Sequence, residues 1–233
     1  MATVPPARRG RPWRPGYPAV KRGVDVLVSA TGLVLASPVM AAVAAAVRWK
    51  LGSPVFFRQQ RPGLDGRPFE LLKFRTMRVL GPSDGVANDA DRLTPFGLWL
   101  RSTSLDELPS LWNVVRGDMS LVGPRPLLME YLDRYSPEQR RRHEVRPGIT
   151  GLAQVRGRNL LGWEEKFSAD VEYVDGLGPR MDLRILLATL VKVLQRHGVS
   201  APGEANMLPF MGSGHVTGVT DGNDLRERAV ERR

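Results

Sequence analysis

The chain has 233 residues, 42% of them hydrophobic, and a formal net charge of +10. This length allows one sizeable core plus an anchor, and the charge suits an anionic partner such as nucleic acid, an anionic membrane surface or a phosphate-rich substrate. The absence of cysteine excludes disulfides, thiolate catalysis and cysteine metal sites, and the three scattered histidines lack the spacing of a zinc site.

The chain begins with a basic segment. Residues 1–23 contain six basic residues, five prolines and no acidic residue, a composition that predicts an extended or disordered segment. The apolar block that follows is long, and no small-residue cleavage site precedes a polar mature start, which argues against a cleaved secretory signal. We therefore treat the segment as part of the mature chain.

The most apolar block runs from Val24 to Val47. As a straight helix it would extend roughly 36 Å, enough to cross a bilayer core of about 30 Å. Two features favour a re-entrant helix-break-helix instead. Pro38 removes a backbone hydrogen bond near the middle, where Ser37 can bond a freed carbonyl, and basic residues flank both ends, which pulls both to the cytoplasmic side. A spanning helix and a buried soluble helix remain alternatives.

A short β-hairpin follows the apolar block. Residues 54–60 and 67–75 flank a glycine-rich turn, and their alternation places Lys73 and Arg75 on one face, as solvated charges or phosphate ligands. Residues 81–91 form a polar loop, after which Thr94 and Pro95 begin a short apolar helix.

Two adjacent carboxylates, Asp106 and Glu107, follow Arg101 in the most informative stretch of the chain. Ser104 and Glu107 have capping-box spacing, but Pro109 favours a helix that begins at Asp106, or within a residue or two of it, and ends near Gly117. An acidic cap is the simpler explanation of the pair. A helix N-terminus also favours anions, so the position suits phosphate chemistry as well.

Two loops rich in glycine and proline carry arginines. Residues 117–126 hold Arg125 between two prolines, and residues 146–159 begin with Arg146. Both loops suit phosphate recognition through arginine and backbone N–H groups, although a solvated arginine is the commoner case.

Three further helices are expected in the C-terminal half. One begins at Ser136 and carries a cluster of arginines that suits either a membrane-surface face or a solvated face: Arg140, Arg141, Arg142 and Arg146. The second begins near Trp163 and buries the stripe Trp163, Phe167 and Val171. The third spans residues 182–196 with leucines along one side, and beyond about residue 212 the composition predicts a loose tail.

Several blocks together give the chain a family resemblance. It resembles the bacterial sugar transferases, the small monotopic phosphoglycosyl transferases that start glycan assembly on a lipid carrier. The order and spacing match from about residue 17 to about residue 212, and the absence of an extra transmembrane block before Lys21 leads us to expect the minimal catalytic form. The matching blocks are Lys21–Asp25, Ser37–Pro38, Lys73–Met77, Ser104–Pro109, Gly117–Pro126 and Arg146–Gly151.

The resemblance and the residue patterns together predict an α+β, mainly α fold, with a re-entrant membrane helix and a compact cytoplasmic catalytic domain that has a small β-hairpin and amphipathic surface helices. We expect four segments. These are a basic proline-rich segment (1–20), the membrane helix broken at Ser37 and Pro38 (21–50), the catalytic domain (51–200) and a C-terminal extension (201–233).

The resemblance implies transfer of a sugar 1-phosphate from a nucleotide-sugar, usually a UDP-sugar, to a polyprenyl phosphate such as undecaprenyl phosphate. Asp106 matches the family nucleophile, which forms a phospho-aspartyl intermediate, and Glu107 matches its partner. Both are assigned to Mg²⁺, a cation that prefers carboxylate and phosphate oxygens. The substrate phosphates would be bound by four arginines: Arg75, Arg101, Arg125 and Arg146.

The resemblance also implies the partners and the location. These are a nucleotide-sugar donor, a polyprenyl phosphate acceptor, membrane lipids and a possible second copy in a homo-oligomer, at the cytoplasmic face of the bacterial plasma membrane, with no nucleic acid. The alternative is a membrane-associated nucleic-acid-binding or lipid-binding module without catalysis, which leaves the Asp106–Glu107 pair unexplained.

Overall fold

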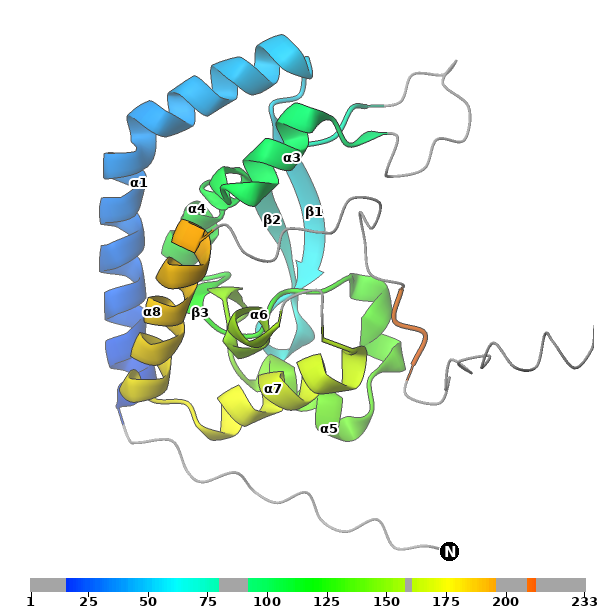
Figure 1. The fold of residues 1–233 in the computed structure, drawn as a ribbon. Helices are drawn as coiled ribbons and strands as arrows, with labels where there is room; N and C mark the ends of the chain where they lie inside the picture. The colour runs from blue at the N-terminus through cyan, green and yellow to red at the C-terminus, as the bar shows by residue number, and fades with distance from the viewer. Residues whose placement is uncertain (1–15, 80–91, 158–160, 196–208, 213–233) are drawn as a thin grey trace, which may run out of the picture.

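A computed structural model describes residues 16–79, 92–157, 161–195 and 209–212. The expected polar loop at 81–91, residues 1–15 of the N-terminal basic segment and the tail beyond 212 lie outside these residues. Residues 17–23, which composition predicted to be extended or disordered, are helical because they continue into the apolar block as one helix. The helices and strands follow in the order α1 (Tyr17–Lys50), β1 (Phe56–Pro62), β2 (Pro68–Phe74), α3 (Pro95–Ser102), α4 (Ser110–Arg116), β3 (Ser120–Val122), α5 (Pro137–Arg140), β4 (Gly148–Thr150), α6 (Leu152–Arg156), α7 (Trp163–Asp175) and α8 (Pro179–Gln195) (Figure 1).

Helix α1 runs along one flank of the molecule and bends partway along its length (Figure 1). Pro38 lies inside it, and its missing N–H leaves the Val34 carbonyl without the usual helical donor. The Ser37 hydroxyl donates to that carbonyl at 2.8 Å, which confirms the predicted compensation. The helix continues through Pro38 as one element, so the bend is observed while the path of α1 relative to a bilayer remains a prediction.

The first half of α1 is apolar on the outside and polar on the inside. Val24 and Leu27 are exposed, whereas Asp25 and Ser29 are buried. An 18-residue window of α1 has a mean hydropathy of 2.1 and only 11% of it is buried, so the helix is long and apolar enough to cross a membrane. Because the exposed face is the apolar one, α1 is suited to membrane association.

The predicted hairpin is present. Strands β1 and β2 pair antiparallel, with Phe56 opposite Phe74 and Pro62 opposite Pro68. A second, unpredicted sheet joins β3 and β4 in parallel, with Ser120 opposite Gly148. Its strands have three residues each and lie far apart in the sequence, so they leave no periodic signal that a single sequence can reveal.

The core consists of several apolar clusters around these sheets. Val43 and Val47 of α1 pack with Phe74 and Leu100, so one side of the second half of α1 is buried against the rest of the molecule. The stripe predicted on α7 is also confirmed, because Phe167 and Val171 are buried and Trp163 packs partly buried beside them.

The arginine-rich helix differs from its prediction. A capping box between Ser136 and Gln139 does start α5, but the helix ends at Arg140 and a 3₁₀ turn, η4 (Arg141–Glu144), follows. Arg142 is only 2% exposed, and the Arg141 guanidinium pairs with Asp175 of α7. The arginines therefore do not form one membrane-surface or solvated face, because two of them make ion pairs with carboxylates of α7.

Candidate functional site

The Asp106–Glu107 pair lies in a 3₁₀ turn, η2 (Leu105–Glu107), directly before α4. Ser104 begins this turn in the left-handed region with φ 56° and makes no side-chain cap, and the N-cap of α4 is Pro109. The turn η2 begins within the predicted two residues of Asp106, but α4 begins later than predicted, because its N-cap lies three residues after Asp106. The proline argument holds in part, because a proline at an N-cap removes no intrahelical donor. The predicted end is confirmed, since Gly117 closes α4 with φ 97°.

Glu107 is held by two cations and makes no capping bond. Its Oε1 atom accepts from Lys73 Nζ at 2.7 Å and from Arg125 Nη2 at 2.9 Å. Burial by itself favours the neutral acid, but the Arg125 and Lys73 charges outweigh burial and hold the pKa of Glu107 below its usual range. Glu107 is thus a fixed anion that joins strand β2 to the loop after β3.

Asp106 differs from its neighbour. It is 8% exposed, and among the described residues none donates a hydrogen bond to its carboxylate. Burial first, and then the Glu107 charge, raise the pKa of Asp106 to about 6, although Lys73, Arg125 and Arg101 act in the opposite direction. A carboxylate with this pKa is still mostly ionised at pH 7 and has lone pairs available to attack an electrophile.

Arg125 is positioned by two loops that cross at glycines. A Cβ on Gly148 would lie 2.1 Å from the Gly123 nitrogen, and one on Gly151 would lie 2.2 Å from the Gly123 oxygen, so only glycine permits this approach. Gly148 N donates to the Pro124 carbonyl at 2.9 Å. The loops predicted as phosphate clasps therefore brace each other and place Arg125 beside Glu107.

The other predicted phosphate ligands are not all brought to the carboxylates. Arg101 is close enough to lower the pKa of Asp106, and its Nε donates to Thr76 Oγ1 at 3.0 Å. Arg75 is 5% exposed, and its guanidinium donates to the carbonyls of Leu51 and Ser53. Arg146 donates from Nε to the Gly117 carbonyl at 2.9 Å. Arg75 and Arg146 thus bind backbone carbonyls, whereas Arg125 contacts Glu107 and Arg101 lies close enough to act on Asp106 through its charge.

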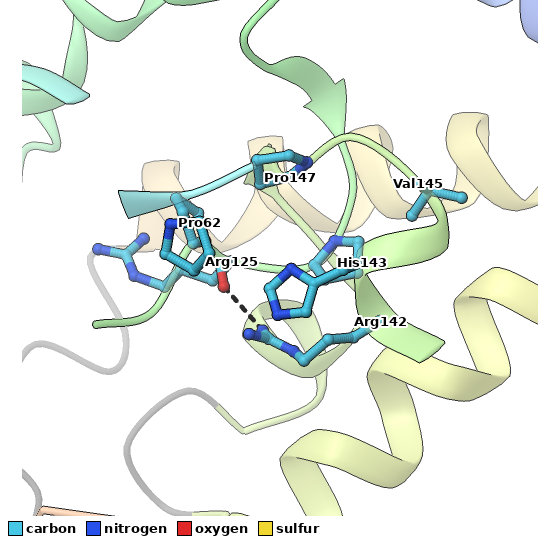
Figure 2. Close-up of a pocket in the computed structure, with 8 residues that line it drawn as sticks. Pro62, Arg125, Arg142, His143, Val145 and Pro147 are labelled. Atoms are coloured by element: carbon cyan, nitrogen blue, oxygen red, sulfur yellow. Dashed lines mark hydrogen bonds between the residues drawn. The ribbon is translucent and has the colours of Figure 1, made fainter. Parts of the chain in front are cut away.

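Three residues that support the site were not among its predicted residues. Lys73 was expected to be a solvated charge or a phosphate ligand, and the structure pairs it with Glu107 instead. Arg142 and Asp170 form a buried ion pair at 2.7 Å, and the Arg142 Nη2 atom also donates to the Arg125 carbonyl at 2.7 Å (Figure 2). Asp170 lies between Phe167 and Val171 on the buried face of α7, and a carboxylate on an apolar stripe indicates a buried partner.

A small pocket lies beside Arg125, lined by proline rings, Arg142 and His143 (Figure 2). The His143 Nδ1 atom lies 3.3 Å from the Gly63 carbonyl and donates to it. Burial, followed by the Arg142 charge, lowers the pKa of His143 to about 4, so the imidazole is neutral at pH 7. His143 thus adds no charge to a pocket that already contains the Arg125 and Arg142 guanidinium groups.

The donor set at the acidic pair is compatible with Mg²⁺. Within the described residues no group of three or more His, Cys, Asp or Glu side chains is arranged to hold a metal. Mg²⁺ is usually bound by one or two carboxylates together with substrate phosphates and water, so a full protein cage is not required. The Asp106 carboxylate receives no donor from the described residues, and both cations on Glu107 use Oε1, which leaves acceptor oxygens for a cation that arrives with a phosphate.

Chemically, this site can attack a phosphate and stabilise the charge that develops. Asp106 supplies a nucleophilic oxygen, and Arg101 and Arg125 supply positive charge near it. Lys73 shares Glu107 with Arg125 and helps to keep that carboxylate ionised.

Comparison with known proteins identifies the lineage of this chain. The family model described as bacterial sugar transferase matches residues 16–196. An uncharacterized sugar transferase, EpsL of Bacillus subtilis, is 50% identical over 199 residues, which cover 85% of this chain and 98% of that protein.

Two relatives have names that state an activity. A UDP-glucose:undecaprenyl-phosphate glucose-1-phosphate transferase of Caulobacter vibrioides is 44% identical over 187 residues, 75% of this chain and 69% of the relative. The galactosyl transferase CpsE of Streptococcus agalactiae is 38% identical over 189 residues, again 75% of this chain but 42% of the relative. The shared region thus makes up most of this chain and a smaller part of the longer relative.

Proposed function

The chain belongs to the bacterial sugar transferase family, and from this premise we propose that it transfers a sugar 1-phosphate from a UDP-sugar to undecaprenyl phosphate, with release of UMP. One observation carries the proposal: no described residue donates a hydrogen bond to the Asp106 carboxylate, although the adjacent Glu107 is ion-paired with Lys73 and Arg125. The activity printed for the Caulobacter relative supports the donor and acceptor classes.

In the proposed reaction an Asp106 oxygen attacks the phosphorus that bears the sugar. A bond forms between Asp106 and phosphorus, the bond to the bridging diphosphate oxygen breaks, and UMP leaves with that oxygen. An oxygen of the lipid phosphate then attacks the same phosphorus and releases the Asp106 carboxylate, so the enzyme is regenerated and the sugar diphosphate stays on the lipid.

The neighbouring groups act on charge. Arg101 and Arg125 stabilise negative charge on the transferring phosphoryl group, and Lys73 together with Arg125 keeps Glu107 ionised. Asp106 and Glu107 would hold Mg²⁺, which supplies charge neutralisation for the approaching diphosphate when bound.

The membrane arrangement is part of the proposal. Helix α1 enters the cytoplasmic leaflet and returns at its bend, so that residues before Lys21 and after Lys50 both remain on the cytoplasmic side. The bend at Pro38, the exposed apolar face and the basic residues at both ends support this path. An acceptor whose phosphate stays at the bilayer surface also favours a catalytic face held against that surface.

The decisive experiment is UMP release from UDP-glucose, UDP-galactose and UDP-N-acetylglucosamine with undecaprenyl phosphate in nanodiscs. We expect repeated UMP release with at least one of the three donors. When the lipid phosphate is omitted, each enzyme molecule should release no more than one UMP. A folded, membrane-bound protein that releases no UMP from any of the three donors would favour the lipid-binding alternative, and salt-sensitive binding of DNA would favour the nucleic-acid module.

The topology is tested with single cysteines, because the chain contains none of its own. Ala19→Cys and Ser53→Cys place thiols at exposed positions before and after the apolar block. Both should react with an impermeant maleimide only from the cytoplasmic side. Labelling from opposite sides would mean that α1 spans the membrane.

A further inference from the structure

Few backbone hydrogen bonds are available to fix the position of Arg125. Pro124 and Pro126 flank it and have no N–H groups, and the guanidinium is 46% exposed where it reaches Glu107. The Pro124 carbonyl is fixed by Gly148 N, and the Arg125 carbonyl accepts from the Arg142 Nη2 atom at 2.7 Å (Figure 2). Arg142 is thus a direct contact of the residue that pairs with Glu107.

Arg142 is fixed in one orientation. Its Nε and Nη2 atoms donate to Asp170 Oδ2 at 3.0 and 2.7 Å, and its Nη1 atom donates to the Tyr135 hydroxyl at 3.2 Å. The guanidinium carbon lies 5.7 Å from the ring centroids of both Tyr135 and Phe167. All three nitrogens are therefore used, and one of them is shared between Asp170 and Arg125.

Stability alone explains this pair poorly. Desolvation of two charges costs about as much as their attraction returns, so apolar residues of similar volume often replace a buried ion pair without loss. What apolar residues do not replace is the directional hydrogen bond from Arg142 to the Arg125 carbonyl. That bond links helix α7, which carries Asp170, to the acidic pair through the contacts Asp170–Arg142–Arg125–Glu107.

We propose that Arg142, oriented by Asp170, is a positioning residue that sets the Arg125 guanidinium against Glu107 and the transferring phosphate. This inference rests on the proposed function for its effect on turnover. The η4 turn would then influence turnover indirectly, because Arg142 contacts Arg125 and Arg125 contacts Glu107.

The main test is the double variant Arg142→Met/Asp170→Leu, which removes both buried charges together. We expect a folded protein whose kcat for UMP release falls about 100-fold, since a displacement near 1 Å can cost that much. Arg142→Lys keeps the charge but loses the planar fork, and should lie between the wild type and the double variant. The matched control is Arg141→Gln, which breaks the neighbouring ion pair to Asp175 of α7 and leaves the Arg125 contact intact.

A structural role is separated from a positioning role by combining variants. If Arg142 acts through Arg125, then Arg142→Met/Asp170→Leu added to Arg125→Gln causes no further loss of kcat. Losses that multiply would overturn the proposal. Wild-type kcat in the folded Arg142→Met/Asp170→Leu protein would overturn it as well.

A measurement without substrate distinguishes failure of this inference from failure of the proposed function. In ¹⁵N-arginine-labelled protein, the Arg125 guanidinium signal is assigned by its disappearance in Arg125→Gln. In the wild type we expect slow rotation of this guanidinium, and in Arg142→Met/Asp170→Leu faster rotation, even if no donor is ever turned over. Equal rotation in the two proteins would contradict the positioning role, whatever the enzyme transfers.

Discussion

Two clusters of buried charge in this molecule are built in opposite ways. In the anchor cluster, which consists of Tyr17, Lys21, Asp25, Tyr173 and Asp182, both carboxylates have partners. Asp182 accepts from Tyr17 and Lys21 at 2.7 Å and from Tyr173 at 2.8 Å, and Asp25 accepts from Ser120 at 2.7 Å. In the catalytic cluster, which consists of Lys73, Arg101, Asp106, Glu107 and Arg125, only Glu107 is paired in this way.

This difference indicates that the anchor cluster serves to attach α1 and that the catalytic cluster serves the reaction. A carboxylate with several donors is held in place and is a poor nucleophile, whereas Asp106 keeps its lone pairs and a pKa near 6. The anchor cluster joins α1 to α7, α8 and strand β3, so it attaches the apolar helix to the rest of the molecule. Changes in the anchor cluster should therefore affect stability, and changes in the catalytic cluster should affect turnover.

The largest effect is expected from Asp106→Asn. An amide cannot form the phosphoryl bond, so turnover should fall at least about 10³-fold. Membrane association should remain, and the melting temperature should be unchanged or higher because a buried charge has been removed. Radiolabelled UDP-sugar assays and thermal unfolding in nanodiscs measure the two quantities.

Asp65→Asn is the matched control for this change, since Asp65 is exposed in a turn with φ 56°, a conformation that asparagine also tolerates. It should leave turnover within twofold. Near-normal activity of Asp106→Asn would show that Asp106 is not the nucleophile. The two clusters would then no longer differ in the role of their carboxylates.

The second prediction concerns the anchor cluster. Asp182→Asn leaves the Lys21 ammonium without its 2.7 Å partner, and we expect a loss of about 3 kcal/mol in the free energy of unfolding. Lys21→Met in the same protein removes an ammonium whose remaining carboxylate partner, Asp25, lies 3.8 Å away, and should recover part of this loss. Turnover per folded molecule should stay near the wild-type value. A variant that keeps its stability but loses turnover would show that the anchor cluster takes part in the reaction.

The sequence was sufficient for the parts of this fold that leave local signals. The hairpin, the Thr94 cap, the Gly117 terminus and the bend at Pro38 depend on turn residues, caps and proline, whose effects act within a few residues. The acidic pair and Arg125 were selected through the family resemblance, since their local patterns suit an acidic cap and a solvated arginine equally well, and the structure places Arg125 against Glu107.

Long-range contacts could not be predicted in the same way. The β3–β4 sheet pairs strands 28 positions apart, and Glu107 is held by Lys73 from a strand 34 positions earlier. The capping-box spacing of Ser104 and Glu107 suggested a local bond, but the two cations compete for the same carboxylate and outweigh a single backbone N–H. Arg75 and Arg146 look like phosphate ligands in sequence, yet both bind carbonyls that only the folded chain brings near.

The third prediction is a pH dependence of stability caused by His143, which lies in the pocket beside the catalytic cluster. Its pKa is lowered from 6.5 to about 4 in the folded protein, mainly by burial, with Arg142 and Arg140 adding repulsion. The unfolded chain therefore binds more protons between these values, so stability is complete above pH 6.5 and falls as the pH drops toward 4. The loss should reach about 3 kcal/mol.

Urea unfolding of wild type and His143→Phe between pH 4 and 7 measures this effect. The variant should lose the part of the pH dependence that belongs to His143, while both proteins share the titration of their carboxylates. Equal slopes in the two proteins would mean that the pKa of His143 is the same in the folded and unfolded states, so that His143 gains a charge beside the catalytic cluster below about pH 6.5.

The smallest effect is expected from Ser37→Ala on the helix that carries much of the anchor cluster. The Ser37 hydroxyl satisfies the Val34 carbonyl that Pro38 leaves free, and the contact is exposed on the protein surface. In water that carbonyl would find another donor, but in hydrocarbon it would not, so the loss should be about 1 kcal/mol in nanodiscs and smaller in a detergent that admits water to α1. Ser53→Ala, outside the apolar block, is the control. An equal loss in both environments would place the bend of α1 in water, and then the apolar face of the helix would need a protein partner to cover it.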